Sequence, residues 1–163
     1  MALCQRLQGL FDEERPAYQL LRHTEAFTAN EVAAASHVPG RELAKVVVLR
    51  DKGGAFVMVS LPAPTRVDVE AVVSATAHGG LRLAEEHEFV SLFPDCDAGA
   101  MPPFGPLYDL PLYEDACLAR SPEIAFQAGN HEEIVVMDHA DYARLARPVS
   151  GQFCFHRTPR AAG

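Results

Sequence analysis

The stretch Ala44-Lys45-Val46-Val47-Val48-Leu49 decides the fold class of this chain. A run of β-branched residues without polar alternation is typical of a strand that is buried on both faces. The glycine-containing turn 51–54 follows it and leads into a second apolar segment, 55–61. Because glycine accepts the positive φ that tight turns need, the two segments are predicted to form a β-hairpin.

Helical and strand patterns alternate on both sides of this hairpin. Thr28 and Glu31 have the spacing of a capping box, while Asp68 and Asp138 are placed to cap two further helices. Helices are expected at 3–14, 84–93 and 116–119, and strands at 18–22, 81–83, 111–113, 123–128, 132–137 and 152–156. The pattern predicts one α+β domain over residues 1–156, with a mixed, barrel-like sheet surrounded by helices. Residues 157–163 are expected to be a disordered tail.

The charge balance argues against a protein that coats nucleic acid. The chain carries 22 acidic and 14 basic side chains, a net charge of −8, whereas coating needs many phosphate contacts. Contact with only the end of a nucleic acid is still compatible with this charge. Five of the cations gather in one region, where a solvated hairpin face explains them equally well: Arg41, Lys45, Arg50, Lys52 and Arg66.

The cysteines and the lack of a membrane or secretion segment indicate the cellular compartment that we expect for this protein. No apolar stretch approaches the roughly 20 residues of a membrane helix, and the N-terminus does not resemble a secretion signal. Under these conditions the four cysteines predict reduced thiols in a cytoplasmic protein: Cys4, Cys96, Cys117 and Cys154. Their wide separation, together with histidines that form no HxxxH or HExxH pair, predicts no zinc site.

Lys45 is one of only two lysines in the chain. At the edge of a buried strand its ammonium must reach water or meet an anion, because an unpaired charge is costly to bury. Two other elements also offer polar chemistry: a proline-stiffened loop over residues 99–105 and a tight turn over residues 128–131. Glycines in such turns let backbone N–H groups approach an oxygen. Taken singly, each element also fits a surface lysine, a structural loop or a hairpin turn.

In this order and spacing the three elements resemble the YbaK/EbsC-type aminoacyl-tRNA deacylases, which are related to the editing domain of bacterial prolyl-tRNA synthetase. The resemblance runs from about Tyr18 to Pro148 and includes the strand that begins at Lys45. Its carriers are residues 27–32, 38–48, 61–63, 66–68, 92–96, 99–105, 110–113 and 128–132.

The resemblance implies a free-standing enzyme that hydrolyses the ester between a wrong, small amino acid and the 3′ end of a tRNA, with tRNA-Pro as the first expectation. It implies no metal and no organic cofactor. The expected partner is the aminoacyl-tRNA 3′ end, delivered by prolyl-tRNA synthetase or an elongation factor because of the acidic charge. Neither DNA nor a membrane is expected as a partner.

The family's functional positions fall on residues of this chain. The resemblance places catalytic roles on Lys45, Gly99 and His131, with Lys45 binding a phosphate or the ester and the Gly99 loop stabilising an oxyanion. Water or a ribose hydroxyl would attack, and His131 would orient that water or shape the wall. The substrate-binding residues it implies are Ala100, Met101, Pro102, Pro103, Phe104, Gly129 and Asn130.

Two departures from the family pattern bear on amino-acid specificity. Members often have Thr or Ser at the position of Asn130, and many have a polar residue at the position of Val46. Two other functions stay open on the residues alone. One is a non-catalytic module that binds an aminoacyl or nucleotide end, and the other is a hydrolase that uses the thiol of Cys96 or Cys117.

Overall fold

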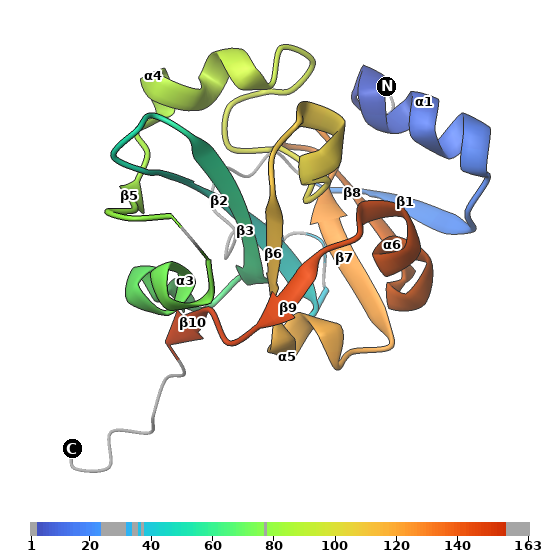
Figure 1. The fold of residues 1–163 in the computed structure, drawn as a ribbon. Coiled ribbons are helices and arrows are strands. Elements are labelled where there is room, and N and C mark those ends of the chain that lie inside the picture. Colours follow the sequence, from blue (N-terminus) through green and yellow to red (C-terminus); the bar gives the residue numbers. More distant parts are fainter. Residues whose placement is uncertain (1–2, 24–31, 34–35, 37, 77, 156–163) are drawn as a thin grey trace.

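A mixed eight-stranded sheet forms the centre of the molecule (Figure 1). The computed structural model describes residues 3–23, 32–33, 36, 38–76 and 78–155. Seven strands follow the order β1-β8-β7-β2-β3-β6-β9, β5 pairs with β2, and β4 with β10 forms a separate pair. The strands are β1 (Tyr18–Arg22), β2 (Leu43–Arg50), β3 (Phe56–Pro62), β4 (Arg66–Val67), β5 (Arg82–Leu83), β6 (Leu112–Asp115), β7 (Glu123–Gln127), β8 (Glu133–Asp138), β9 (Val149–Gly151) and β10 (Cys154–Phe155).

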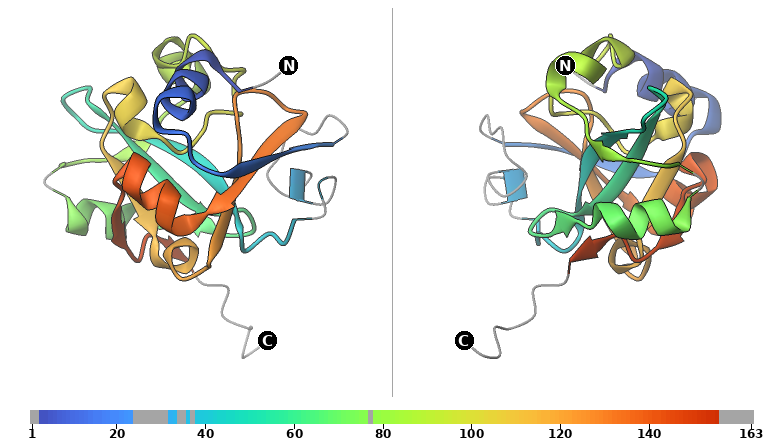
Figure 2. Two further views of the ribbon diagram at one scale, coloured as in Figure 1. Left: turned by 90° about the vertical axis from the view of Figure 1, so that its right-hand side faces the viewer. Right: turned by 60° about the vertical axis from the view of Figure 1, so that its left-hand side comes forward.

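Helices cover the sheet on two sides, which confirms the predicted α+β class. Figure 2 shows α1 and α6 on one side of the molecule and α3 on the other. The helices are α1 (Gln5–Glu14), α3 (Val69–Ala75), α4 (Glu86–Phe89), α5 (Ala116–Ala119) and α6 (His139–Ala146), with 3₁₀ turns η1 (Val90–Leu92) and η2 (Gly105–Tyr108). None of the helices in these described ranges is long and apolar enough to cross a membrane. The predicted cap at Thr28 lies outside the described residues.

The predicted central hairpin is confirmed. β2 and β3 pair antiparallel from Ala44 opposite Pro62 to Arg50 opposite Phe56, and Gly54 in the turn has a φ of +91°. The start of β2 also pairs in parallel with β7, where Ala44 lies opposite Phe126. This second pairing fixes Lys45 close to the end of β7.

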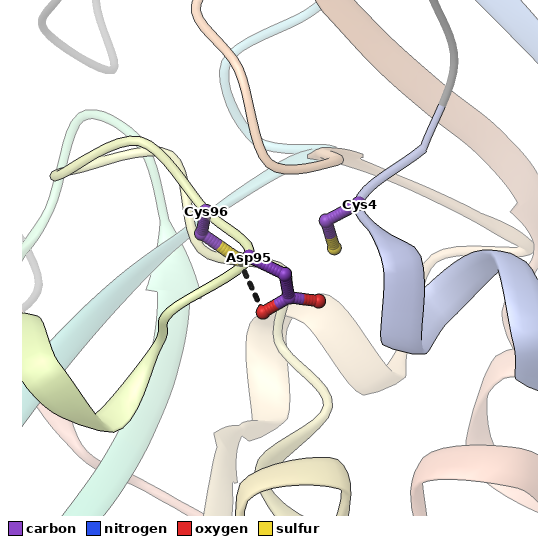
Figure 3. Close-up of side chains that lie close together, drawn as sticks. All are labelled: Cys4, Asp95 and Cys96. Carbon is purple, nitrogen blue, oxygen red and sulfur yellow. Dashed lines mark hydrogen bonds between the residues drawn. The ribbon is translucent and has the colours of Figure 1, made fainter.

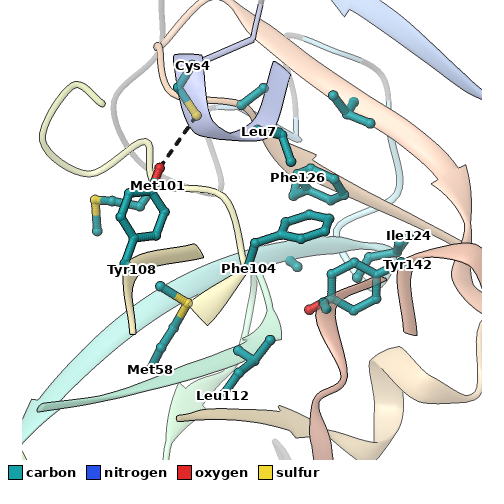
Figure 4. Close-up of a cluster of buried hydrophobic side chains, with 14 of the residues drawn as sticks. Cys4, Leu7, Met58, Met101, Phe104, Tyr108, Leu112, Ile124, Phe126 and Tyr142 are labelled. Carbon is teal, nitrogen blue, oxygen red and sulfur yellow. Dashed lines mark hydrogen bonds between the residues drawn. The ribbon is translucent and has the colours of Figure 1, made fainter. Parts of the chain in front are cut away.

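Alternate residues of β2 face two different apolar clusters. Ala44 and Val48 belong to the larger cluster, which α1, α6 and the proline-rich loop cover (Figure 4). Leu49 belongs to a second cluster, together with Val72 of α3. Since side chains alternate along a strand, Lys45 lies on the face of Leu49, away from the larger cluster.

Three local expectations are corrected by the structure. The helix expected at 84–93 is only one α-helical turn followed by a 3₁₀ turn, because a capping box at Glu85 starts it late. Asp138 stands at the start of α6, but its side chain accepts no capping hydrogen bond from the described residues. The strand expected at 152–156 is shortened to β10, since the N–H groups of Phe153 and Cys154 turn to the Asp115 carboxylate.

Candidate active site

A tight turn over residues 97–100 opens the proline-rich loop. The N–H of Ala100 donates to the carbonyl oxygen of Asp97 at 3.0 Å, and Gly99 has a φ of +83°. A positive φ at the third residue is the feature of a type II turn, which explains why glycine stands there. The turn therefore presents the Ala98–Gly99 peptide at its outer end.

The turn between β7 and β8 is joined directly to this loop. Gly129, with a φ of +109°, donates its N–H to the carbonyl oxygen of Ala100 at 2.9 Å and accepts from the N–H of Asp97 at 2.8 Å. A side chain at Gly129 would also collide with Cys4, because a Cβ there would lie 2.6 Å from the Cβ of Cys4. The Gly129 position thus permits the close approach of three segments.

His131 fixes the orientation of the Ala98–Gly99 peptide. Its Nε2 lies 2.8 Å from the carbonyl oxygen of Ala98, and since a carbonyl oxygen only accepts, Nε2 carries the hydrogen. In a trans peptide the N–H points away from the C=O, so this bond aims the N–H of Gly99 in the direction opposite to His131. The imidazole holds a backbone donor in place.

Two backbone donors of the loop stay available for a ligand. Within the described part of the chain, no hydrogen bond engages the N–H of Gly99 or of Met101, while the N–H of Ala100 is used inside the turn. The next two residues, Pro102 and Pro103, have no N–H to donate. The loop therefore offers Gly99 and Met101 as candidate oxyanion donors.

Lys45 lies on β2, the strand whose start pairs with β7. Its side chain is half-buried, and within the described residues it forms no hydrogen bond or ion pair. Burial is the main influence on the pKa of Lys45 and lowers it; Cys154 raises this pKa and the nearby Arg66 charge lowers it, each by less than burial does. Phe126, the β7 residue beside Ala44, precedes Gly129 by three residues, about 10 Å of extended chain. Thus the structure joins Gly99 to His131, whereas the Lys45 side chain extends from the other face of β2 and no hydrogen bond within the described residues links it to either loop.

The side chains of the proline-rich loop anchor it in the core. Residues 100–104 are all buried, and the Phe104 ring packs edge-on against Phe126 and Tyr142 at centroid distances of 5.3 and 5.2 Å. The hydroxyl of Tyr142 donates to the carbonyl oxygen of Pro103 at 2.8 Å. Met101 lies in the same cluster (Figure 4). These contacts hold the loop against the core.

Asn130 stabilises its own turn. Its Oδ1 accepts from the N–H groups of Glu132 and Glu133 at 2.8 and 2.9 Å, and its Nδ2 donates to the Glu133 carboxylate at 3.0 Å. These bonds shape the turn that carries His131.

The cation cluster noted in the sequence divides in the structure. Arg50 is neutralised, since its guanidinium lies 2.6 Å from the Glu88 carboxylate. Arg41 is exposed and forms a loose ion pair with Glu42, with 3.9 Å between the charged atoms. Arg66, also exposed, forms no ion pair with a described residue. Gly40 and Ala63 are hydrogen-bonded, which places the chain around Arg41 beside the segment that leads to Arg66. Arg41, Lys45 and Arg66 are hereafter the cationic edge.

The thiol of Cys96 is a poor nucleophile in this setting. Its hydrogen bond with Cys4 and its burial raise the pKa of Cys96, and thiol reactivity depends on the thiolate. The geometry thus disfavours a thiol-dependent hydrolase at Cys96.

Sequence reasoning did not identify the Ala98 carbonyl or Arg66 as part of the site. Ala98 acts through its backbone, which leaves no residue-type signal. Arg66 was noted as one member of a charge cluster and as part of a segment that carries the family resemblance, without a role in the site. The approach of Arg66 to Lys45 depends on pairing between strands.

Comparison with known proteins agrees with this geometry. Residues 23–145 match the family model described as "Aminoacyl-tRNA editing domain". Curated proteins from Escherichia coli K12 and O157:H7, both named "Multifunctional Ser/Thr-tRNA deacylase ProXp-y", are 34% identical over 153 residues, covering 88% of each chain.

Solved structures share the fold. The crystal structure of the hypothetical protein APE2540 has a TM-score of 0.81 at 18% identity and covers 93% of this chain and 100% of its own. A crystal structure described as a proposed trans-editing enzyme for prolyl tRNA synthetase has a TM-score of 0.77 at 21% identity, covering 93% and 96%. These likenesses confirm the predicted fold class.

Proposed function

This chain belongs to the aminoacyl-tRNA editing-domain family and is an aminoacyl-tRNA deacylase, and from this premise we propose that it hydrolyses tRNAs esterified with serine or threonine. The proposal follows the name of the Escherichia coli relatives at 34% identity. A tRNA-Pro that carries a small wrong amino acid is the second candidate, supported by the likeness to the structure described for prolyl tRNA synthetase.

In this proposal the cationic edge receives the 3′ end of the tRNA. Lys45 and Arg66 lie near each other, as their electrostatic interaction indicates, and two unneutralised cations suit a phosphodiester. Lys45 is half-buried at the strand start, so its charge acts through a partly desolvated medium and binds an anion more strongly than a surface lysine does.

The Gly99 loop stabilises the charge that develops during hydrolysis. A water molecule attacks the ester carbonyl carbon and gives up a proton, which a ribose hydroxyl of the tRNA can relay to the leaving oxygen. The carbonyl oxygen becomes an oxyanion facing the N–H groups of Gly99 and Met101. Collapse of this intermediate breaks the bond to the ribose oxygen, which takes a proton and leaves as the free 3′ end. One oxyanion donor typically contributes about 3 kcal/mol of transition-state stabilisation.

His131 is a positioning residue in this mechanism. Its Nε2–H is committed to the Ala98 carbonyl, so that nitrogen is not available as a base. This bond is the observation that carries the proposed mechanism, because it fixes the peptide whose N–H is expected to face the substrate.

Delivery of the tRNA by a second protein is also proposed. With a net charge of −8, affinity for phosphate is limited to the cationic edge. Prolyl-tRNA synthetase or an elongation factor is expected to raise the rate at low enzyme concentration.

A panel of aminoacyl-tRNAs tests the substrate assignment. tRNAs charged with serine, threonine, alanine, cysteine and proline would be incubated with the enzyme and with Lys45→Ala, whose folding is checked by circular dichroism. The expected result is selective loss of the serine and threonine esters, abolished in the variant. Hydrolysis of only the alanine or cysteine ester would contradict the assignment, and survival of every ester would favour a binding module.

A further inference from the structure

Three metal-binding side chains meet beside the candidate active site. The sulfur atoms of Cys4 and Cys96 and a carboxylate oxygen of Asp95 all lie within 4.8 Å of one another (Figure 3). Cys4 precedes α1, whereas Asp95 and Cys96 belong to the loop that leads to Gly99. We propose that Cys4, Asp95 and Cys96 form a zinc site, a property that is independent of the deacylase activity.

Neighbouring groups hold the Asp95 carboxylate in place. One of its oxygens accepts from the N–H of Arg6 at 2.9 Å, and the other accepts from the hydroxyl of Tyr108 at 3.0 Å. The same hydroxyl lies 3.3 Å from the sulfur of Cys96 and 3.7 Å from that of Cys4. Such outer contacts orient ligands before a metal arrives.

The donor set selects the metal. Two sulfurs and one carboxylate suit Zn²⁺, whereas Mg²⁺ and Ca²⁺ prefer oxygen ligands alone. Binding follows a simple balance: one Zn²⁺ replaces the protons of two thiols and joins an ionised carboxylate, so two protons are released. Three protein ligands leave the fourth tetrahedral position for water.

The cavity beside the site has acidic walls, although the Arg6 guanidinium packs over the Tyr108 ring at 5.0 Å from its centroid. A cavity of about 790 Å³ adjoins the site, and Cys4, Asp12, Asp95 and Asp97 are among its walls. The described residues that line it include no lysine or arginine.

The metal would connect α1 to the active-site loops. The N–H of Cys4 donates to the carbonyl oxygen of Ala128 at 2.8 Å, next to Gly129. Cys96 precedes Gly99 by only three residues. The spacing rules, which predict no zinc site, do not consider ligands that come from distant parts of the sequence.

Metal titration of the reduced, metal-free full chain tests the site. Zn²⁺ is expected to bind one per chain with release of two protons, measured with a chelating indicator and a pH indicator. Cd²⁺ in its place should give thiolate-to-cadmium charge-transfer absorption. Cys4→Ser and Cys96→Ser should each weaken binding at least about 10-fold, and Asp95→Asn serves as a second, milder variant.

Cys117→Ser is the matched control, because that thiol lies outside the cluster, and its zinc affinity should equal the wild type's. Zinc binding that survives both Cys96→Ser and Asp95→Asn would overturn the proposal. The absence of stoichiometric zinc binding would also overturn the proposal. This conclusion would hold whether or not mass spectrometry detects a Cys4–Cys96 disulfide after peroxide treatment.

Discussion

At the scale of single residues, Lys45 is the cation on which the proposed substrate contact depends. It sits half-buried at the start of a buried strand, where an ammonium without an anion carries a cost. The fold brings a second cation, Arg66, near Lys45. The two positive charges together are suited to an anionic ligand, which a lone lysine at a strand edge would not indicate.

Replacement of Lys45 by alanine is expected to lower kcat/KM about 100-fold, because a charge-assisted contact to the substrate is lost, worth roughly 1.5–3 kcal/mol. Steady-state kinetics of seryl-tRNA deacylation by wild type and Lys45→Ala measure this change in kcat/KM. The chain supplies its own control, since Lys52→Ala removes the only other lysine, which lies exposed in the hairpin turn. Equal activity of the two variants would argue against the role of Lys45.

At the scale of elements, the Gly99 turn couples backbone conformation to catalysis. The φ of +83° at Gly99 is unfavourable for other residues by about 1–2 kcal/mol. A Cβ there would lie 3.6 Å from Cε1 of His131, an ordinary contact, so strain and not collision is the consequence.

Gly99→Ala is therefore expected to lower kcat 10- to 100-fold as the turn relaxes and its N–H moves, an effect of the size expected for a partly misplaced oxyanion donor. Gly9→Ala is the matched control, because Gly9 lies in α1 with open space around it and should gain about 0.5–1 kcal/mol of stability. Single-turnover deacylation rates of wild type, Gly99→Ala and Gly9→Ala measure this effect. An unchanged kcat in Gly99→Ala would remove the loop from the mechanism.

Asp115 joins β6, α5 and the segment before β10. Its carboxylate accepts from the N–H groups of Phe153, Cys154 and Cys117 at 2.8, 3.1 and 2.9 Å. Burial raises the pKa of Asp115, but these hydrogen bonds outweigh burial and lower it below its usual value of 3.8. A depressed folded-state pKa stabilises the fold above the unfolded pKa, and this contribution is lost as pH falls through the folded value.

Asp115→Ala is expected to lower the free energy of unfolding by about 3 kcal/mol at pH 7, since three buried N–H groups lose their acceptor. The loss should shrink as the pH falls well below 3.8. Urea denaturation at pH 7 and at low pH measures both values. A loss independent of pH would show that the carboxylate charge contributes nothing.

Local patterns in the sequence predicted most elements, and tertiary contacts account for the rest. The hairpin, the Asp68 cap and the α5 helix follow from residues close in sequence, so each was predictable. The His131–Ala98 bond and the Cys4–Cys96 approach join segments far apart in the chain. Because backbone acceptors and distant partners leave no local pattern, the sequence alone did not reveal them.

At the scale of the whole molecule, an acidic protein must bind an anionic substrate through a small surface. Within the cationic edge, Arg41 is paired with Glu42, which leaves Lys45 and Arg66 as two phosphate contacts. The logarithm of KM should therefore rise with the logarithm of the salt concentration with a slope near 1.4, about 0.7 for each contact to a single strand. Arg66→Ala is expected to reduce the slope by about 0.7. Arg144→Ala, on α6 and paired with Glu14 and Asp141, should leave it unchanged. A wild-type slope of several units would contradict this limited contact.

The most direct test of the mechanism is the single-turnover rate of seryl-tRNA deacylation by wild type, His131→Ala and His131→Gln. If His131 acts by donating to the Ala98 carbonyl, alanine should lower the rate 10- to 100-fold, and glutamine, which keeps an N–H donor near the Nε2 position, should restore most of it. Equal, severe losses in both variants would show that the imidazole itself takes part in proton transfer, and the positioning role would be wrong.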